Sequence, residues 1–344
     1  MATRREFLTT GAAAATAFSG TGAAGLAGEP DGKVLDTGER KAARPGHEAP
    51  TLRLHLLGCG YPPPGGTGDQ TRHGSAFLLQ VGRELLMIDC GPATTYKMAR
   101  MGISAKRVSH VFLTHHHFDH NVDFPCFALV RWDLCKGTES PLCVYGPPPT
   151  RAFVERLFGA EGAFFPDWHS RVTHPVSIEI FEHRGGTPPR PAPAFDVREV
   201  QQRGPAKVEQ TASWTATAAR VHHVEPTLLS LAFRFDTDRG SIVFAGDCGD
   251  CPALRELAQG ADTLVVPCVS VGSANAPSYL DGIIMGAHEV RAIAKAAGVG
   301  RVVLTHNGSV NAPEKRKPFI DAVGEVFDAE VLFPDELTTI DLSL

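Results

Sequence analysis

Thr114-His115-His116-His117-Phe118-Asp119-His120 is the most informative segment of the chain, because it contains the pattern His-x-His-x-Asp-His. It follows the short apolar segment Val108–Leu113, which is typical of a buried strand. A strand that runs into a tight loop can direct the first and third of these ligand-type histidines at one point. The aspartate and the last histidine then turn towards a neighbouring point. Imidazole and carboxylate groups are ligands for zinc, iron and manganese, so the segment predicts a metal site at a strand end.

This segment resembles the metallo-β-lactamase superfamily, and the resemblance extends from Thr51 to the C-terminus. It implies an α/β fold, a four-layered αββα sandwich. It also implies further metal ligands in later loops, each placed just after a strand, where loops gather at one edge of a sheet. The candidates are His223 in Val221-His222-His223-Val224, Asp247 in Phe244-Ala245-Gly246-Asp247, and His306 in Leu304-Thr305-His306-Asn307.

By this resemblance, the ligands divide between two metal ions. His222 is an alternative to His223, which is favoured because it lies nearer the downstream segment Phe233–Phe235, as the family spacing prefers. Asp89 matches a position that orients a ligand histidine from behind, or it simply ends a strand. One ion would take His115, His117 and His223, the other would take Asp119, His120 and His306, and Asp247 would bridge them.

The expected cofactors are two Zn²⁺ ions, with Mn²⁺ or Fe²⁺ as alternatives. Two such ions can hold a bridging hydroxide at neutral pH and stabilise the charge that develops on oxygen during attack. The resemblance therefore implies a metal-dependent hydrolase. Asp119 is the expected catalytic residue, which would orient the nucleophile or carry its proton.

Three segments resemble the branch of the family that contains ribonuclease Z and arylsulfatase-like hydrolases: Leu56–Gly60, Ser230–Phe235 and Ala296–Val299. The chain departs from the tRNA-processing members, because Ile284 stands where they carry a histidine, and His288 four residues on is more typical of a solvated helix start. It has no long basic arm and a net charge of −5, which argues against a nucleic-acid partner. We expect a small-molecule ester substrate, such as an aryl sulfate, a phosphodiester or a lactone.

Three other functions stay open. Some relatives bind one iron ion through similar histidines and act as thiol dioxygenases, although the larger ligand set here favours two ions. A ribonuclease Z-like phosphodiesterase is the second alternative. The third is a binding protein that kept the fold without the chemistry, which a complete ligand set disfavours.

The N-terminus resembles a twin-arginine signal, with Arg4-Arg5-Glu6-Phe7-Leu8 followed by a weakly apolar stretch rich in alanine, glycine and threonine. We expect residues 1–28 to be this signal peptide, 29–50 a linker and 51–344 the hydrolase domain. The twin-arginine export machinery would then be a partner, and the protein would be periplasmic or secreted. The apolar stretch is too short and too polar for a stable membrane span.

Several further features leave alternatives. Cys248 and Cys251 would be a disulfide or two ordinary thiols beside the site. Trp132 and Trp168, with Phe164 and Phe165, would line a substrate pocket or, more commonly, anchor core and loops. The glycine- and proline-rich stretch Phe181–Pro193 is typical of a loop or arm near the site. Helices are expected at Pro252–Gln259, Ala287–Ala297 and Pro318–Phe327.

Overall fold

The structure is a computed structural model that describes residues 51–61, 72–272, 282–307, 310, 312–325 and 329–343. The expected signal peptide and linker, residues 1–50, lie outside the described residues. So do residues 326–328, which include the end of one expected helix.

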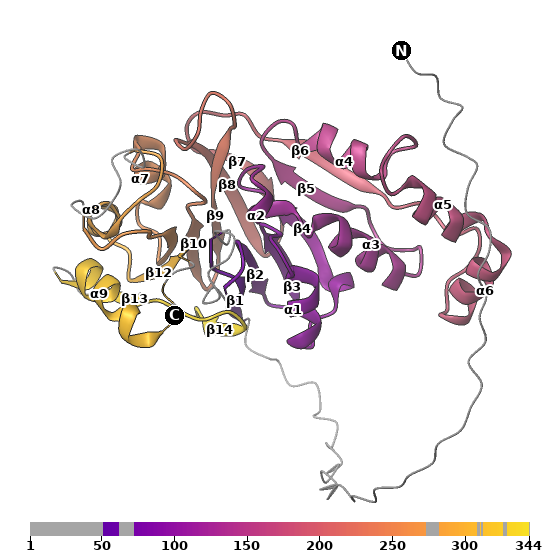
Figure 1. Ribbon diagram of the computed structural model, residues 1–344, viewed down its shortest axis with the longest axis horizontal. Helices are drawn as coiled ribbons and strands as arrows, with labels where there is room; N and C mark the ends of the chain where they lie inside the picture. The colour runs from indigo at the N-terminus through magenta and orange to yellow at the C-terminus, as the bar shows by residue number, and fades with distance from the viewer. Residues whose placement is uncertain are drawn as a thin grey trace, which may run out of the picture. The chain divides into compact units, whose positions relative to one another are not determined.

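Two mixed β-sheets form the centre of the fold (Figure 1). The first has the strand order β14-β1-β2-β3-β4-β5-β6, and the second has the order β13-β12-β11-β10-β9-β8-β7. The strands of the first sheet are β1 (Leu52–Gly58), β2 (Ala76–Val81), β3 (Glu84–Ile88), β4 (Val108–Phe112), β5 (Leu142–Gly146), β6 (Phe195–Glu199) and β14 (Thr338–Asp341). Those of the second are β7 (Ala206–Gln210), β8 (Trp214–Val221), β9 (Ser230–Thr237), β10 (Gly240–Phe244), β11 (Thr263–Pro267), β12 (Arg301–Thr305) and β13 (Glu330–Leu332).

Helices cover the outer face of each sheet. Figure 1 shows those that follow β3, β4 and β5 on one side of the two sheets and the C-terminal helices on the other. The first set is α1 (Thr94–Arg100), α2 (Phe118–Asn121), α3 (Phe124–Leu134), α4 (Thr150–Phe158), α5 (Phe165–Thr173) and α6 (Pro175–His183), with a short 3₁₀ turn at Ala105–Arg107. The second set is α7 (Pro252–Ala258), α8 (Ala287–Ala297) and α9 (Pro313–Gly324).

The alternation of side chains along β3 explains why the molecule has several layers. Leu86 and Ile88 belong to the core between the two sheets, whereas Leu85 and Met87 belong to the core between the first sheet and its helices. Successive side chains of a strand point to opposite faces, so an unbroken apolar strand is buried on both. The second sheet has its own core against α7, α8 and α9. The predicted αββα sandwich is therefore confirmed.

Aromatic rings fill part of the space between the sheets. Phe112 at the end of β4 contacts Phe233 and Phe235 of β9 edge to face, with ring centroids 5.3 and 4.9 Å apart. Such edge-to-face pairs add to the free energy of burial. This packing holds the end of β4, where the histidine segment begins, against the second sheet.

The stretch Phe181–Pro193 differs from its expected form. Its first residues complete α6, and the following loop packs on the side chain of Trp132 in α3, whose ring N–H donates to the carbonyl of Pro191 over 3.0 Å. The prediction of an arm near the site was wrong, because the proline-rich loop is fixed to the far end of α3. Among the helices of the described ranges, none is both long and apolar enough to cross a membrane.

Candidate metal centre

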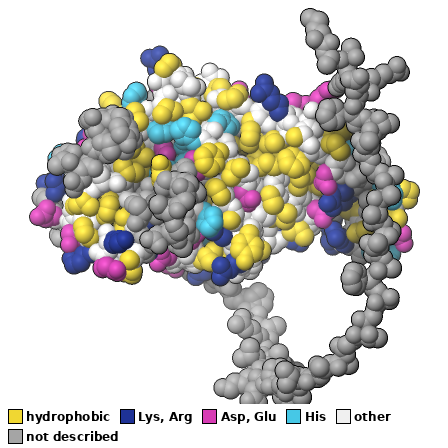
Figure 2. All heavy atoms as spheres, viewed as in Figure 1, with side chains coloured by type: hydrophobic (Ala, Val, Ile, Leu, Met, Phe, Trp, Pro, Cys, Tyr) yellow, Lys and Arg dark blue, Asp and Glu magenta, His cyan; other side chains and the backbone are white. Residues whose placement is uncertain are grey.

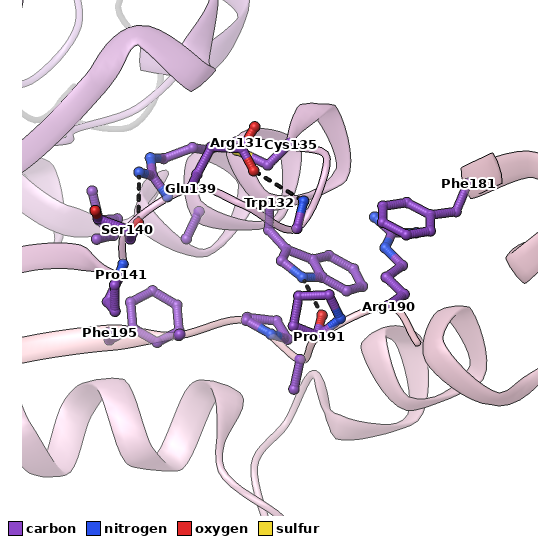
Figure 3. A pocket seen from close by; sticks show the side chains of 16 residues that line it. Arg131, Trp132, Cys135, Glu139, Ser140, Pro141, Phe181, Arg190, Pro191 and Phe195 are labelled. Carbon is purple, nitrogen blue, oxygen red and sulfur yellow. Dashed lines mark hydrogen bonds between the residues drawn. The ribbon is translucent and has the colours of Figure 1, made fainter. Parts of the chain in front are cut away.

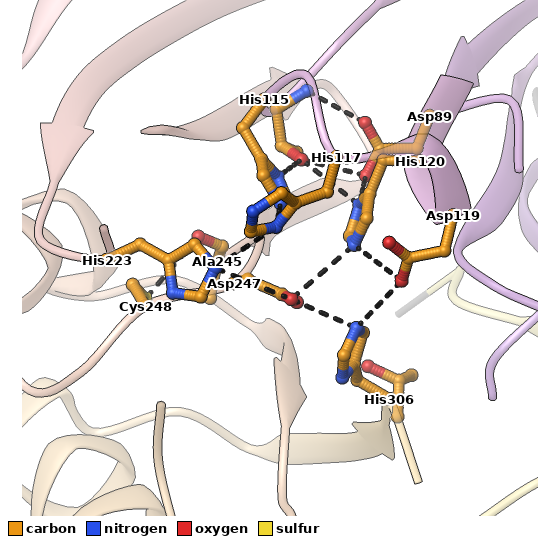
Figure 4. A network of polar contacts seen from close by, with 12 residues as sticks. Asp89, His115, His117, Asp119, His120, His223, Ala245, Asp247, Cys248 and His306 are labelled. Carbon is orange, nitrogen blue, oxygen red and sulfur yellow. Dashed lines mark hydrogen bonds and ion pairs between the residues drawn. The ribbon is translucent and has the colours of Figure 1, made fainter. Parts of the chain in front are cut away.

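The directions of the strands bring the candidate ligands to one edge. Strands β8 and β10 both run antiparallel to β9, and β10, β11 and β12 run parallel. The ends of β8, β10 and β12 therefore lie at the same edge of the second sheet. His223, Asp247 and His306 follow these three ends. In the first sheet, parallel strands β3 and β4 end at Asp89 and at the histidine segment, so that all five loops meet (Figure 4).

The first donor group consists of three imidazoles and one carboxylate. His117 Nδ1 lies 2.9 Å from His115 Nε2 and 3.4 Å from His223 Nε2. The ligand atoms of these histidines and of Asp247 all lie within 4.8 Å of one another. Three imidazole nitrogens and a carboxylate around one point form a set that suits zinc.

The second donor group consists of Asp119, His120 and His306, whose ligand atoms also lie within 4.8 Å of one another. Asp119 Oδ2 is 3.4 Å from His120 Nε2 and 3.3 Å from His306 Nε2. All three side chains are buried. The loop after β4 thus contributes members to both groups.

Asp247 connects the two groups. Its Oδ2 lies 2.9 Å from His306 Nε2, 3.5 Å from His120 Nε2 and 4.0 Å from His223 Nε2 (Figure 4). Gly246 allows this approach: its φ is +62°, and a Cβ there would lie only 2.9 Å from the Cβ of Thr114. A residue with a side chain at position 246 would push Asp247 away from the histidine segment.

Asp89 and Thr114 hold the site from behind. Asp89 Oδ2 lies 2.7 Å from His120 Nδ1, and its Oδ1 accepts a hydrogen bond of 2.7 Å from the backbone N–H of Thr114. The hydroxyl of Thr114 donates to Asp89 Oδ2 over 2.9 Å. His223 Nδ1 is held in the same way, because it lies 2.6 Å from the carbonyl oxygen of Ile283. Thr114 and Ile283 were not expected from the sequence, and a backbone acceptor such as Ile283 leaves no sequence signal.

Two site residues have a backbone conformation that costs free energy. Asp89 has φ of 56° and His306 has φ of 55°, in the left-handed region that residues other than glycine seldom occupy. Each such residue costs roughly 1–3 kcal/mol and persists where the surrounding structure requires it. Here, the turn at each strand end points a ligand-type or supporting side chain into the site.

The donor atoms fit divalent cations. The carboxylates of Asp247, Asp89 and Asp119 raise the pKa of His120 against the effect of burial, so a cation would displace a proton from this ring. The neutral ring would then donate from Nδ1 to Asp89 and direct the lone pair of Nε2 into the site. This Nε2 atom is buried and makes no hydrogen bond to the described residues, and the carboxylates of Asp119 and Asp247 lie 3.4 and 3.5 Å from it. Buried polar atoms are rarely left without a partner, and a cation at this point would supply one.

The two groups differ in their electrostatics. Burial lowers the pKa of His115 and His117, which favours the neutral form that a cation needs. Burial also opposes charge on His306, but the carboxylates of Asp247 and Asp119 outweigh it and raise its pKa to about 9. Burial disfavours the ionised form of Asp119 too, yet hydrogen bonds from His120 and His306 lower its pKa.

Other candidates lie outside the two groups. His222 is exposed, and its carbonyl accepts a hydrogen bond from the N–H of Gly249, so the structure brings His223 and not His222 into the cluster. His288 is exposed on α8. Cys248 is buried and Cys251 is half-buried, and both are free thiols in the structure. Burial raises the pKa of Cys248 well above that of an ordinary thiol.

The tryptophans line cavities away from this centre. Trp132 stacks on the guanidinium of Arg190, 4.0 Å from its ring, beside a cavity of about 130 Å³ (Figure 3). Trp168 lines a second cavity and donates a hydrogen bond to the carbonyl of Phe158. None of the seven donor residues lines either cavity. The two tryptophans therefore anchor the region of α3 to α6.

Comparison with known proteins agrees with this geometry. Residues 85–307 match the family described as the Beta-lactamase superfamily domain. The ribonuclease Z of Mycobacterium marinum (strain ATCC BAA-535 / M) is 31% identical over 264 residues, 74% of this chain and 86% of that protein. The ribonuclease Z of Mycobacterium bovis (strain BCG / Pasteur 1173P2) is 28% identical over 300 residues, 85% of this chain and 98% of that protein.

Solved structures show the same fold. The metallo-beta-lactamase fold protein YhfI from Bacillus subtilis superposes with a TM-score of 0.61 at 20% identity, over 85% of this chain and 100% of that one. The short form of human tRNase Z gives a TM-score of 0.58 at 19% identity, over 85% of this chain and 100% of that one. With the two donor groups at the strand ends, these matches lead to one conclusion: the chain belongs to the metallo-β-lactamase superfamily of metal-dependent hydrolases and is homologous to ribonuclease Z.

Proposed function

We propose that the protein is a hydrolase with two divalent cations, both zinc, that cleaves a small ester-type substrate such as an aryl sulfate, a phosphodiester or a lactone. The position of Asp247 between the two donor groups carries this proposal. A shared carboxylate of this kind suits a pair of cations better than one. His115, His117 and His223 would hold one ion, and Asp119, His120 and His306 the other.

A pair of divalent cations, when bound, lowers the pKa of water from 15.7 to about 7 and stabilises negative charge on the reacting oxygens. The role of the protein is to hold the ligand rings in a fixed orientation. Asp89 and the carbonyl of Ile283 fix the rings of His120 and His223 through their Nδ1 atoms. Such partners behind the ligands set both ring orientation and tautomer.

Asp119 is the proposed catalytic residue. Its Oδ2 lies within 3.4 Å of two imidazole nitrogens, and the pKa of its carboxyl is lowered, so it is ionised at neutral pH. An ionised carboxylate beside the reacting atoms accepts a proton from the nucleophile or orients it. This role requires the charge of Asp119 and not only its oxygen atoms.

Ribonuclease Z-like cleavage of RNA is the second candidate, because the curated relatives carry that name. Position 284 argues against it. Ile283 bonds to His223, so its neighbour Ile284 lies beside the centre, yet an aliphatic side chain cannot transfer a proton. The net charge of −5 also disfavours a polyanionic substrate. A one-iron dioxygenase would leave the second donor group without a use.

We further propose export by the twin-arginine route, which would make the protein periplasmic or secreted. The support is the pair Arg4-Arg5 in the sequence alone. Replacing both with lysine should retain the protein in the cytoplasm, as judged by fractionation of cells that express the full chain. Export of the doubly substituted protein at the normal level would contradict the proposal.

The test of the hydrolase begins with metal-free protein that is reconstituted with zinc. Aryl sulfate, phosphodiester, lactone and tRNA-precursor substrates are compared with and without chelator. We expect chelator-sensitive turnover of at least one small ester, and Asp119→Asn should lower it by about 10²-fold or more while zinc content changes little. Asp250→Asn on the surface is the matched control. Cleavage of the tRNA precursor alone would favour the second candidate, and oxygen uptake with one iron per chain would contradict both.

A further inference from the structure

His306 is held in place differently from His120 and His223. Nδ1 of His120 lies against the carboxylate of Asp89, and Nδ1 of His223 lies against a backbone carbonyl oxygen. Nδ1 of His306 is buried and makes no hydrogen bond to the described residues. The backbone of His306 is also in the left-handed region, with φ of 55°. Because this conformation persists only where the surroundings require it, the direction of the ring depends on contacts of the backbone.

The residue after His306 provides those contacts. The N–H of Asn307 donates to the carbonyl of Cys59 over 3.4 Å, and its side-chain amide donates to the carbonyl of Cys268 over 3.0 Å. The carbonyl of Asn307 accepts a hydrogen bond of 3.2 Å from Nη1 of Arg72. The first bond fixes the peptide group that follows His306, and the third fixes the next one. The turn is therefore held by three other segments of the chain.

Arg72 ties this turn to two further parts of the fold. Its Nη2 atom donates to the carbonyl of Pro334 over 2.5 Å and to the sulfur of Cys59 over 2.7 Å. Its guanidinium also lies over the ring of Phe333, 5.1 Å from the centroid. The planar guanidinium presents its donors in a fixed geometry, so the acceptors that it binds are held in fixed relative positions. Arg72 thus links the loop after β12 to the end of β1 and to the segment between β13 and β14.

The segment that carries Arg72 also packs on the other side of the second donor group. Gly74 lies so close to Asp119 that a Cβ at position 74 would be 2.6 Å from the Cβ of Asp119. Two ligands of the second group, Asp119 and His306, therefore depend on this one segment. The three histidines of the first group follow β4 and β8, which are other strand ends.

Arg72 is too deeply buried to bind a substrate itself. Histidine side chains gather near the middle of the face seen in Figure 2, whereas Lys and Arg side chains lie mostly toward its edges. Arg72 is only 5% exposed, and both of its terminal nitrogens donate to groups of the protein. A buried arginine with engaged donors acts through the residues that it holds.

We propose that Arg72 is a positioning residue, whose guanidinium holds the turn at His306 and Asn307 and keeps the His306 ring directed at the second donor group. This inference rests on the proposed two-metal function and assigns part of the zinc affinity of the second group to a residue outside it. Without this support the turn relaxes out of the left-handed region. The Nε2 atom of His306 then moves away from Asp119 and Asp247, which lie 3.3 and 2.9 Å from it.

The first experiment measures the zinc affinities of the two groups in the full chain by competition with a chromophoric chelator. Arg72→Lys keeps the positive charge but replaces the fork with a single donor atom. We expect it to weaken zinc binding at the second group about 10–100-fold and to leave the first group unchanged. A change that only lowers the stability of the fold would not separate the two groups in this way.

Arg131→Lys is the matched control. Arg131 is likewise buried and donates to two backbone carbonyls, those of Val108 and Ser140. Val108 begins β4, at the end away from the histidine segment. Arg131→Lys should therefore leave both zinc affinities unchanged, even where it lowers the free energy of unfolding.

A second experiment needs neither zinc nor turnover. Hydrogen exchange of the Asn307 amide in the metal-free full chain reports directly on the turn. Arg72→Lys should speed this exchange about tenfold, the effect of about one net hydrogen bond, and Arg131→Lys should not. Cys59→Ala removes only the sulfur beside Nη2, so it should speed the exchange about threefold and serves if Arg72→Lys does not fold.

The outcomes separate this inference from the proposed function. Equal weakening of both zinc sites by Arg72→Lys would overturn the inference, because Arg72 would then support the fold as a whole. Unchanged exchange at Asn307 in the variants that fold would overturn it as well. Faster exchange at Asn307 in a protein without hydrolytic activity would contradict the hydrolase and still support the role of Arg72.

Discussion

The two donor groups of the metal centre lie side by side but differ in charge. In the first, burial lowers the pKa of His115 and His117 and keeps them neutral. In the second, the carboxylates raise the pKa of His306 to about 9, so the metal-free protein neutralises buried carboxylates with protons on histidines. A cation entering the second group must displace protons, whereas one entering the first finds His115 and His117 neutral. The two sites should therefore differ in how their affinity depends on pH.

Removal of the shared carboxylate should have the largest effect. Asp247→Ala takes a donor from both groups, so we expect turnover to fall by 10³-fold or more and bound zinc to drop below two per chain. Elemental analysis and steady-state rates on the same sample check this. Asp250→Ala, three residues on and at the surface, should behave as the unsubstituted protein. Two tightly held zinc ions in Asp247→Ala would show that Asp247 does not connect the groups.

Removing one histidine from either donor group should empty that group of zinc and leave the other group occupied. His223→Ala should empty the first group and His306→Ala the second, each leaving about one zinc per chain and lowering turnover about 10²-fold. The matched control is His222→Ala, because His222 is the exposed neighbour of His223. If His222→Ala lost zinc and His223→Ala did not, the assignment of this loop would be wrong.

Substitution of Asp89, which holds His120 from behind, should have a smaller effect on the metal centre. Asp89→Asn keeps an acceptor for His120 Nδ1 but removes the charge, which should weaken zinc binding at the second group by about 10–100-fold and leave the first unchanged. Competition with a chromophoric chelator measures the two affinities. Asp123→Asn, whose carboxylate bonds to Thr95 instead, is the control. Equal weakening of both sites would show that Asp89 acts on the fold as a whole.

The smallest expected effect is a difference in how the zinc affinity of the two donor groups depends on pH. A raised pKa means that His306 stays protonated until the pH approaches 9, and the carboxylates also raise the pKa of His120, so zinc affinity of the second group should keep rising with pH up to at least that value. The pH dependence that His115 and His117 impose on the first group should level off below pH 6.5, the ordinary histidine value, because burial lowers the pKa of both. Titrations in buffers of different ionisation enthalpy count the protons released. Equal proton release at both sites would remove the contrast between them.

The local part of the site was predictable because its residues lie together in the sequence. The pattern from His115 to His120 needs only one strand and one loop to form a cluster. His223, Asp247 and His306 were predictable as strand-end residues, and the parallel directions of β10 and β12 explain why two of them meet. Their convergence with the histidine segment depends on the packing of the two sheets, which the resemblance supplied and no single segment contains.

The region from α2 to α6 was not predictable in the same way. The spacing of hydrophobic residues identifies a helix only when one side is polar, and α3 is apolar on both. Helix α5 has no buried residue, so its side chains show no core-facing period. The short strand β6 has a single buried residue, Val197. Periodicity could therefore find neither α5 nor β6, and it could not reveal that Arg190 stacks on Trp132.

We propose that seven side chains from four separate loops enclose two cations. Anomalous diffraction at the zinc edge, from crystals of reconstituted protein, locates such ions directly. We predict two peaks per chain, one among His115, His117 and His223 and the other among Asp119, His120 and His306, with Asp247 in contact with both. A single peak, or peaks bound elsewhere while these side chains remain without metal, would contradict the account.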